Sequence, residues 1–440
     1  MSTLRDVIRR SARLTTLARG VRDAVRGPGP VASPRPGAAD TPGMDGVAEL
    51  LRVRPRAAAA GDGPRLNLLI PTLSARRVFG GAKTAIDLFE ELGRHFPRRR
   101  IVSFTPVTGA STETLDGFVI GSASDERTPP RVVVAAPSGS GTVLAVGPDD
   151  VFLATFWSTA ELAVRLIRWQ SATFGGRLRP YAYLVQDFEA GFYPWSAQYE
   201  LARATYASDV PTIAVVNSGL LGDFLDGQGV RFAGRHTFEP RLDPRLRPLL
   251  DRAANRRGRR IVAYGRPGTP RNAFPLVVDG LRDWVARNGG GGWEVVSAGE
   301  PHPSVDLGRG LVLGRAGKLP IEAYGSLLRE SAVGLSLMVS PHPSYPPLDM
   351  AYLGMRVVTN AFGPKDLSTW HENITSVRSL TAEAIGEALL AATRAFEADP
   401  AAGERARALR LDYLADGPAF PFVDELAAEL LAGSTSPPPS

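Results

Sequence analysis

Short runs of consecutive apolar residues alternate along this chain with longer stretches of helical periodicity. The runs of the first half lie at residues 66–71, 101–104, 131–135, 151–155, 181–185 and 212–217. A continuous apolar run of four to eight residues is typical of a parallel strand that is buried on both faces. The stretches between the runs space their apolar residues three and four positions apart, as at residues 82–92. The pattern therefore predicts an α/β protein with parallel sheets.

A second set of strands follows a segment at residues 236–248 that holds several prolines and no periodicity. These strands are expected at residues 260–263, 293–298, 311–313, 333–339 and 356–359. A chain of 440 residues is long enough for two such domains, each with its own core. The strand at 212–217 is then the last of the first domain. We expect a basic N-terminal helix and Pro/Gly/Ala linker at 1–64, Rossmann-like domains at 65–235 and 236–404, a C-terminal helix at 405–433, and a disordered tail at 434–440.

The stretch 324–360 is the most informative part of the chain. It predicts a helix, a buried strand, a polar loop, a second helix that ends at Gly354, and another strand. The loop 340–347 contains four prolines, which cannot continue either periodicity. Backbone N–H groups and the positive end of the second helix dipole point into such a loop, which makes it an anion cradle. Ser344 and Tyr345 are candidates for phosphate or sugar contacts.

Two arginines follow the first strand of the second domain. Arg266 comes directly after Gly265, and Arg271 and Asn272 precede the next helix. A guanidinium group binds phosphate oxygens with two parallel hydrogen bonds and does not lose its charge. The three polar residues are therefore candidate diphosphate ligands. The alternative is that the arginines are solvated surface residues, because arginine is abundant in this chain.

Two carboxylates follow the strand at 181–185, where doubly wound sheets bind ligands. Asp187 is the candidate catalytic residue, since it would orient or deprotonate an acceptor hydroxyl or stabilise positive charge at a sugar carbon. Glu189 is a weaker candidate beside it. The alternative is an aspartate that caps the next helix. Nearby aromatic residues suit a sugar or a lipid-linked acceptor, or alternatively fill the core: Phe188, Phe192, Tyr193, Trp195 and Tyr199.

A glycine pair, Gly80 and Gly81, stands between the first strand and its helix. It lets the backbone approach a ligand closely, or it forms a tight turn. The glycines do not form GxGxxG, and no acidic residue stands at the distance that binds a ribose, so a dinucleotide cofactor is disfavoured.

Composition excludes several classes of site. The chain has no cysteine, and its five histidines lack metal-ligand spacing, so we expect no metal and no cofactor.

Residues 1–26 hold seven arginines and two aspartates, hence +5 of the net charge of +6. This segment predicts a basic helix that either contacts anionic lipid or packs on the body. The rest is nearly neutral and shows no nucleic-acid-binding module. No secretory signal or run of 18 apolar residues is found, so we expect a cytoplasmic protein, which lies at the inner face of the plasma membrane if the basic helix contacts lipid.

Three ordered sequence blocks carry a resemblance to a known family. They read YLVQDFEAGFYP, LMVSPHPSYPPLDMAYLG and VVTNAFGPKDLS. A polar Pro/Ser loop, an acidic residue, a short helix and a Val-Val-Thr-Asn strand resemble the nucleotide-sugar site of GT-B glycosyltransferases. The blocks together resemble the WsaF-type rhamnosyltransferases, which use dTDP-L-rhamnose. The similarity extends over about residues 66–378.

The resemblance implies a GT-B fold, in which two Rossmann-like domains face each other across a cleft and the last helix crosses back to the first domain. It implies that Arg266 binds the diphosphate of a dTDP-sugar donor, that Asp349 binds the ribose hydroxyls, and that Asn360 belongs to the donor site. Many retaining GT-B enzymes carry two glutamates eight positions apart, where this chain has Pro341 and Asp349. The implied reaction adds L-rhamnose to a growing, lipid-linked polysaccharide without a metal.

Three alternatives remain open. The chain could use another nucleotide sugar on the same fold. It could also be a catalytically silent scaffold of glycan assembly at the membrane, although a silent protein would have no need to keep Asp187, Arg266 and Asp349. A Rossmann dehydrogenase is the third, and the missing GxGxxG weighs against it.

Overall fold

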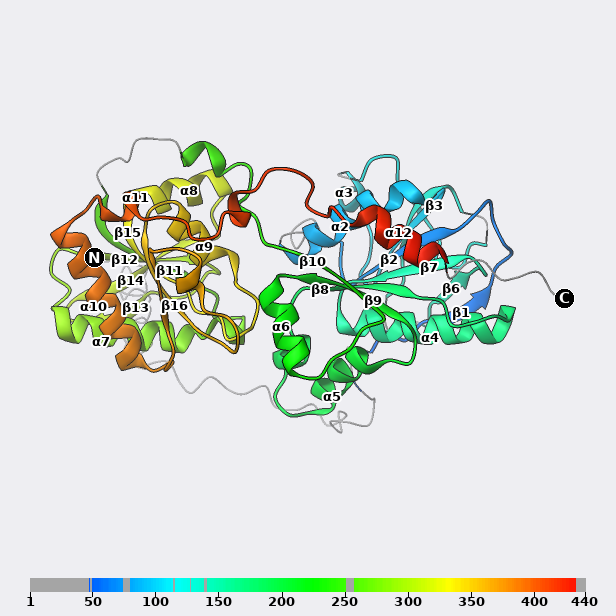
Figure 1. Ribbon diagram of the computed structural model, residues 1–440, viewed down its shortest axis with the longest axis horizontal. Coiled ribbons are helices and arrows are strands. Elements are labelled where there is room, and N and C mark those ends of the chain that lie inside the picture. Colours follow the sequence, from blue (N-terminus) through cyan, green and yellow to red (C-terminus); the bar gives the residue numbers. More distant parts are fainter. Residues whose placement is uncertain are drawn as a thin grey trace, which may run out of the picture. The chain divides into compact units, whose positions relative to one another are not determined.

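The computed structural model describes residues 47, 50–73, 80–113, 115–126, 128–137, 141–250 and 257–432. The basic segment 1–26 and the tail 434–440 lie outside the described residues. The α/β prediction is confirmed: the strands form two large sheets of mainly parallel strands, and helices cover both faces of each (Figure 1).

The first sheet has eight strands in the order β10-β9-β8-β7-β2-β3-β5-β4, and all its neighbours pair in parallel. Its central strands are buried along their whole length because both faces are covered. The strands are β2 (Arg65–Ile70), β3 (Arg98–Ser103), β4 (Val119–Gly121), β5 (Arg131–Ala135), β7 (Asp150–Ala154), β8 (Tyr181–Val185), β9 (Thr212–Asn217) and β10 (Gly234–Phe238).

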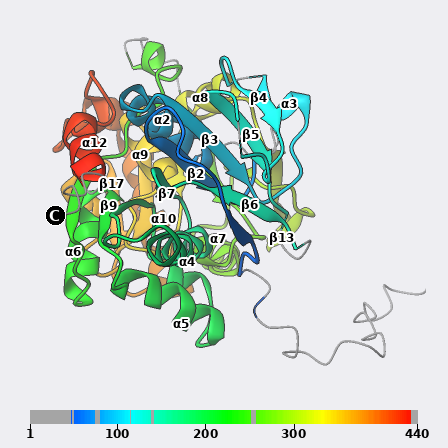
Figure 2. The same cartoon turned by 90° about the vertical axis from the view of Figure 1, so that its right-hand side faces the viewer.

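Alternate strand residues enter two different cores, one on each face of this sheet. Leu68 packs with α2 (Gly81–Leu92) and α12 (Val423–Ala432), and its neighbour Leu69 packs with α4 (Trp157–Phe174). Figures 1 and 2 show α2 and α4 on opposite sides of the sheet. Shorter helices complete this half: α3 (Gly109–Thr112), α5 (Ala197–Ala204) and α6 (Gly219–Gly227).

Two boundaries expected from the sequence need correction. Strand β10 pairs with β9, so 212–217 is not the last strand, and the first sheet continues past the expected boundary at 235/236 to Phe238. The expected linker at 1–64 contains β1 (Arg54–Ala57), which pairs with β6 (Val143–Val146) in a separate two-stranded sheet. Strands β1 and β10 lack the continuous apolar run by which the central strands are predicted.

The second sheet has seven strands in the order β13-β14-β12-β11-β15-β16-β17, and only the β13–β14 pair is antiparallel. The strands are β11 (Gly258–Gly265), β12 (Glu294–Gly299), β13 (Val305–Gly308), β14 (Leu311–Gly317), β15 (Ser331–Leu335), β16 (Arg356–Asn360) and β17 (Ile374–Val377).

Helices α7 (Phe274–Asn288) and α10 (Ala382–Ala398) lie side by side on one face of this sheet (Figure 1). Helices α8 (Ile321–Glu330) and α9 (Tyr345–Tyr352) pack in the core of the other face. The short helix α11 (Ala402–Arg405) follows α10.

Each sheet has a point where the strand order reverses. In the first sheet, β3 and β7 lie on either side of β2, and in the second, β12 and β15 lie on either side of β11. The loops at the carboxyl ends of such neighbouring strands leave in opposite directions, which opens a place for ligands. The candidate site residues follow β2, β8, β11 and β15, or in the case of Asn360 end β16.

Candidate active site

Asp187 is a buried carboxylate just past the end of β8. It is 6% exposed, and its Oδ1 accepts a hydrogen bond from the Phe188 N–H at 2.9 Å and another from the Ser340 hydroxyl. Its Oδ2 lies 3.4 Å from Nε of Arg271. Ser340 follows β15, and Arg271 lies in the 3₁₀ turn Pro270–Asn272 after β11. Strand ends of both sheets therefore contribute to one carboxylate.

Burial is the largest influence on the Asp187 carboxyl and raises its pKa above the ordinary value. The Arg271 guanidinium, the Ser340 hydroxyl and the Phe188 N–H oppose this rise because they stabilise the charged form. A carboxylate with a raised pKa that keeps a nearby cation is suited to accept a proton from a hydroxyl group.

The loop after β15 is held by hydrogen bonds to its backbone. Asn360 accepts from the Met338 N–H at 2.7 Å and donates to the Met338 carbonyl at 3.0 Å. The Lys365 ammonium donates to the same carbonyl, and the Val339 N–H donates to the Arg271 carbonyl at 2.7 Å. These bonds fix the segment that leads to Ser340.

The same bonds explain an error in the sequence analysis. The strand expected at 333–339 ends at Leu335, because the backbone of Met338 is bonded to a side chain instead of a neighbouring strand. The apolar run continues to residue 339, so the hydrophobic pattern alone could not locate this end.

His342 and Ser344 lie in the same loop after β15, and hydrogen bonds hold this part as well. The His342 N–H donates to Ser340 Oγ at 3.0 Å, and the Ser344 N–H donates to His342 Nδ1 at 3.0 Å. Because Nδ1 accepts, the neutral ring carries its proton on Nε2. Burial, with the charges of Lys365 and Arg271, lowers the pKa of His342 to about 3. The imidazole is therefore neutral in the physiological range.

The expected anion cradle is the N-terminus of α9. Ser344 is 4% exposed and precedes this helix with a φ of 71°, a left-handed conformation that is costly for a serine. Tyr345 is the first residue of the helix, and burial raises its pKa. Both candidates thus lie where the positive end of the helix dipole begins.

Asp349 lies one turn further along α9. Its Oδ1 accepts a hydrogen bond of 2.5 Å from the hydroxyl of Tyr413, which comes from the 3₁₀ turn Asp412–Leu414. Burial raises the pKa of this carboxyl to about 7, while the Tyr413 hydroxyl acts against the rise. Tyr413 is 64 residues away in sequence, and no local pattern could have pointed to it.

Arg266 and Asn272 lie at the carboxyl end of β11 but not in the hydrogen-bond set of Asp187. Arg266 is 39% exposed, and its Nε lies 3.0 Å from Oε1 of Glu300. Glu300 also accepts from the Gly268 N–H at 2.9 Å, so it shapes the turn. Asn272 is buried and donates to the Leu337 carbonyl at 3.2 Å, which ties this turn to the loop after β15.

Gly80 and Gly81 lie at the start of α2, next to the end of β8. Gln186 donates to the Gly81 carbonyl at 3.0 Å. A Cβ atom on Gly81 would stand 2.9 Å from the Gln186 amide oxygen, so a side chain there would displace that amide. Gly80 has a φ of 55°, which favours glycine.

Glu189 begins the 3₁₀ turn Glu189–Phe192 after β8, two residues beyond Asp187 in the chain. It is 2% exposed, and its Oε2 accepts from the Trp157 N–H and, at 2.9 Å, from the Tyr183 hydroxyl. Burial raises its pKa to about 8 despite these two donors. Its own N–H donates to the Tyr206 hydroxyl at 3.0 Å. In this structure Glu189 connects β8, α4 and the turn after β8.

Three contributors to the site were missed or undervalued in the sequence analysis. Ser340 bonds Asp187 directly, and its only sequence signal is its position at the start of the proline-rich loop. Lys365 is fully buried, and burial lowers its pKa to about 7. Phe192 lies under Arg271, with its ring centre 4.3 Å from the guanidinium carbon. Its sequence signal was the aromatic cluster after Asp187.

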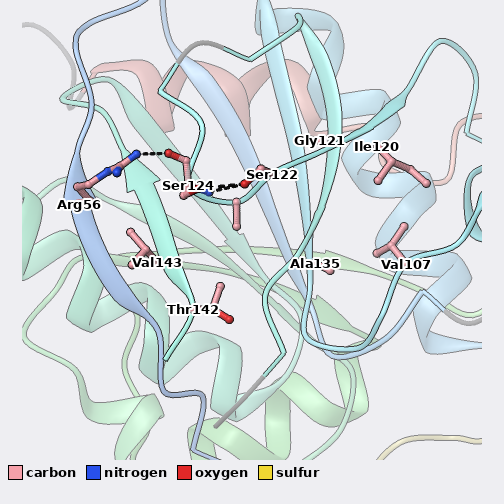
Figure 3. Close-up of a pocket in the computed structure, with 10 residues that line it drawn as sticks. Arg56, Val107, Ile120, Gly121, Ser122, Ser124, Ala135, Thr142 and Val143 are labelled. Carbon is pink, nitrogen blue, oxygen red and sulfur yellow. Dashed lines mark hydrogen bonds between the residues drawn. The ribbon is translucent and has the colours of Figure 1, made fainter. Parts of the chain in front are cut away.

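A separate pocket of about 530 Å³ lies between β1, β4 and β6 of the first half (Figure 3). Ser122 and Ser124 lie on one side of it with their hydroxyl oxygens 3.0 Å apart, and Arg56 donates to the Ser124 carbonyl. None of the ten residues that line it is a candidate named above, and its only charged side chain is Arg56.

Among the residues that the structure describes, no group of three or more His, Cys, Asp or Glu is placed to hold a metal ion. In the same part of the chain, no helix has both the length and the apolar character needed to cross a membrane.

Comparison with solved structures defines the fold class. The chain is similar to sucrose-phosphate synthase from Thermosynechococcus elongatus (TM-score 0.51, 13% identity, 84% of this chain and 98% of that one). It is also similar to OtsA (TM-score 0.53, 8% identity, 84% and 99%). A third is WaaG, a glycosyltransferase involved in lipopolysaccharide biosynthesis (TM-score 0.50, 12% identity, 83% and 99%). The fold is GT-B, as expected.

Sequence comparison defines the family. The model of the WsaF N-terminal domain matches residues 65–219, and that of the WsaF C-terminal domain matches residues 259–390. Together they cover well over half of the chain, which belongs to the WsaF family. A curated relative, the O-antigen biosynthesis protein RfbC of Myxococcus xanthus, is 36% identical over 247 residues. That match takes in 52% of this chain and 18% of RfbC.

Proposed function

We propose that this protein is a glycosyltransferase that moves L-rhamnose from dTDP-L-rhamnose onto a growing, lipid-linked cell-surface polysaccharide. The observation that carries the proposal is the buried Asp187 carboxylate, held by Ser340 and Arg271 at strand ends of both sheets. Membership of the WsaF family and similarity to an O-antigen biosynthesis protein support the reaction class.

In the proposed reaction an acceptor hydroxyl attacks the anomeric carbon of the donor sugar. The new bond joins that carbon to the acceptor oxygen, the bond to the diphosphate oxygen breaks, and dTDP leaves with the electron pair. Asp187 accepts the proton of the acceptor hydroxyl. Its buried position favours this role, because burial raises its proton affinity while the nearby Arg271 cation opposes that rise by favouring the charged form.

In this proposal, cations and backbone N–H groups stabilise the leaving diphosphate. Arg266 is partly exposed and bonded to Glu300, so an anionic ligand would compete with Glu300 for the guanidinium. Arg271 and the N-terminus of α9 supply further positive charge. We assign the ribose hydroxyls to Asp349 and the phosphate or sugar oxygens to Ser344 and Tyr345.

Asn360 and Asn272 would supply rigidity rather than direct contacts. Both polar groups of Asn360 are used by the Met338 backbone, and Asn272 is tied to Leu337, which supports a positioning role for these two residues. Gly80 and Gly81 form the acceptor-side loop of the proposal. The reaction would take place in the cytoplasm, and residues 1–26 would contact the inner face of the plasma membrane.

Donor turnover tests the proposal. The full chain is incubated with dTDP-L-rhamnose or UDP-glucose and a membrane-lipid extract as acceptor, and released nucleoside diphosphate is measured. We expect dTDP release that falls by roughly 10²–10⁴-fold in Asp187→Asn. It should persist in Asp279→Asn, whose carboxylate is an exposed surface group. Consumption of UDP-glucose alone would refute the rhamnosyl assignment, and no consumption of either donor would refute the transferase.

A further inference from the structure

Two aromatic rings on the surface, eight and twelve residues after Asp187 in the chain, are not used by the proposed donor chemistry. Trp195 is 89% exposed, the most exposed large apolar side chain of the described residues. Its ring stacks on that of Tyr199, with ring centres 5.1 Å apart and an angle of 30°. One exposed apolar residue is ordinary on a protein surface. Two stacked aromatic rings form a larger apolar surface, which suits the binding of a ligand.

The pair stands on a rigid support. On one side, the Tyr193 hydroxyl accepts a hydrogen bond of 2.8 Å from the indole N–H of the buried Trp157. On the other side, the Ser196 hydroxyl caps α5 by accepting from the Tyr199 N–H at 3.2 Å. The chain is therefore anchored two residues before Trp195 and one residue after it, and Tyr199 is fixed in the first turn of a helix. A preorganised aromatic surface binds with a smaller entropy cost.

The pair is also close along the chain to an aromatic residue of the candidate active site. Phe192 stacks against Phe156 and lies under the Arg271 guanidinium, which in turn contacts Asp187. Trp195 follows Phe192 by three residues, so their Cα atoms are at most about 11 Å apart. That distance is roughly the length of two sugar rings. An acceptor glycan whose terminal hydroxyl reaches Asp187 can therefore extend over this surface.

We propose that Trp195 and Tyr199 form an acceptor subsite that stacks on the apolar face of a sugar ring, one or two residues before the acceptor hydroxyl. The inference rests on the proposed function. Sugar rings present C–H groups on one face, and aromatic rings suit them because they combine a large apolar surface with few rotatable bonds. Trp and Tyr are also the residues that most often dominate binding energy at interfaces.

Local charge favours a glycan over a membrane surface as the occupant. The segment from residue 193 to 204 contains one acidic and one basic side chain, Glu200 and Arg203, which pair with each other at 2.9 Å. A surface that binds anionic lipid would need an excess of cations around its aromatic anchors. This neutral segment matches an uncharged sugar ring instead.

Trp195 provides its own fluorescence signal. The chain has six tryptophans, and the other five are buried or half-buried: Trp157, Trp169, Trp284, Trp293 and Trp370. Quenching of the full chain by acrylamide therefore reports mainly on Trp195. The probes are neutral oligosaccharides of three to five sugars, including α-linked L-rhamnose oligomers, and anionic phosphatidylglycerol vesicles as the other arm.

We expect a rhamnose oligomer to protect Trp195 from acrylamide and to bind roughly tenfold more weakly to Trp195→Ala. Trp195→Phe should retain part of the affinity. Leu411→Ala removes an exposed apolar side chain that lies elsewhere, at 68% exposure, and should bind as the wild type. Binding of dTDP, measured in parallel, should be unchanged in all three variants.

Equal oligosaccharide binding by Trp195→Ala, or no protection of Trp195 by any oligosaccharide, would overturn the proposal. Protection by vesicles but not by oligosaccharides would overturn it in favour of a membrane contact. If dTDP fails to bind while the oligosaccharide still protects Trp195, the donor assignment fails and the glycan subsite stands.

Discussion

The contact between Arg271 and Asp187 gives the sharpest quantitative prediction. Replacement of Arg271 by Gln removes the cation whose Nε lies 3.4 Å from Oδ2 of Asp187 and leaves the burial of the carboxyl in place. Burial raises the pKa of Asp187 and Arg271 lowers it. The substitution should therefore raise this pKa further.

The size of the effect follows from the distance. Two unit charges 3.4 Å apart interact by about 5 kcal/mol at an effective dielectric constant of ~20, and by about 1.2 kcal/mol in water. These two energies correspond to changes in the Asp187 pKa of roughly 3.6 and 0.9. The Arg271 side chain is 30% exposed, so solvent screens part of the interaction. We expect a rise of about 1–2 units.

The assay is the pH dependence of kcat/KM for donor consumption. If Asp187 is the base, activity requires its charged form, and the acidic limb of the profile reports its pKa. In Arg271→Gln this limb should move to higher pH by about 1–2 units. Arg266→Gln is the matched control, because it removes the other proposed diphosphate ligand, whose ion pair is with Glu300. It should lower activity without moving the limb. Equal limbs in the two variants would refute the reasoning.

Three further substitutions test other contacts. Asn360→Ala removes the hydrogen bonds of this side chain to the N–H and carbonyl of Met338 and should lower the free energy of unfolding in urea by about 2–4 kcal/mol. A loss below ~0.5 kcal/mol would contradict the role of Asn360 in holding the Met338 backbone. Tyr413→Phe removes the hydrogen-bond donor to Asp349 and should lower the free energy of unfolding by about 1–3 kcal/mol. Because the Asp349 carboxyl has a pKa of about 7, this loss should be larger at pH 8 than at pH 6. Equal losses at the two pH values would argue against ionisation of Asp349. The folded state holds the Glu189 proton up to about pH 8 and the unfolded state loses it near 4.5, so wild-type stability falls as pH rises across this window; Glu189→Gln should flatten the thermal-unfolding profile there, and an unchanged slope would refute the shift.

Strands β8 and β9 show how much of the fold could be predicted. Their expected limits, 181–185 and 212–217, are the observed ones, because central parallel strands are continuous apolar runs. Strands at the edges were harder to detect. Strand β10 has a mixed burial pattern and includes Arg235 and His236, so no strand is expected there, and its last three residues fall in the expected linker at 236–248.

The site was predictable only as far as it follows strand ends. The sequence predicts Asp187 and Arg271 as site residues because each stands past the carboxyl end of a parallel strand, and the structure brings them into contact. The hydrogen bond from Ser340 crosses 153 residues of sequence, and that from Tyr413 to Asp349 crosses 64. Such pairs depend on how whole elements pack, and no local periodicity encodes them.

Binding calorimetry with dTDP, UDP and NAD tests the central claim most directly. The full chain and its Arg266→Ala variant are titrated under identical conditions. The account predicts that dTDP binds more tightly than UDP, that NAD does not bind, and that the variant loses roughly tenfold or more in dTDP affinity. Tight binding of NAD would contradict the account, and so would a failure of all three nucleotides to bind.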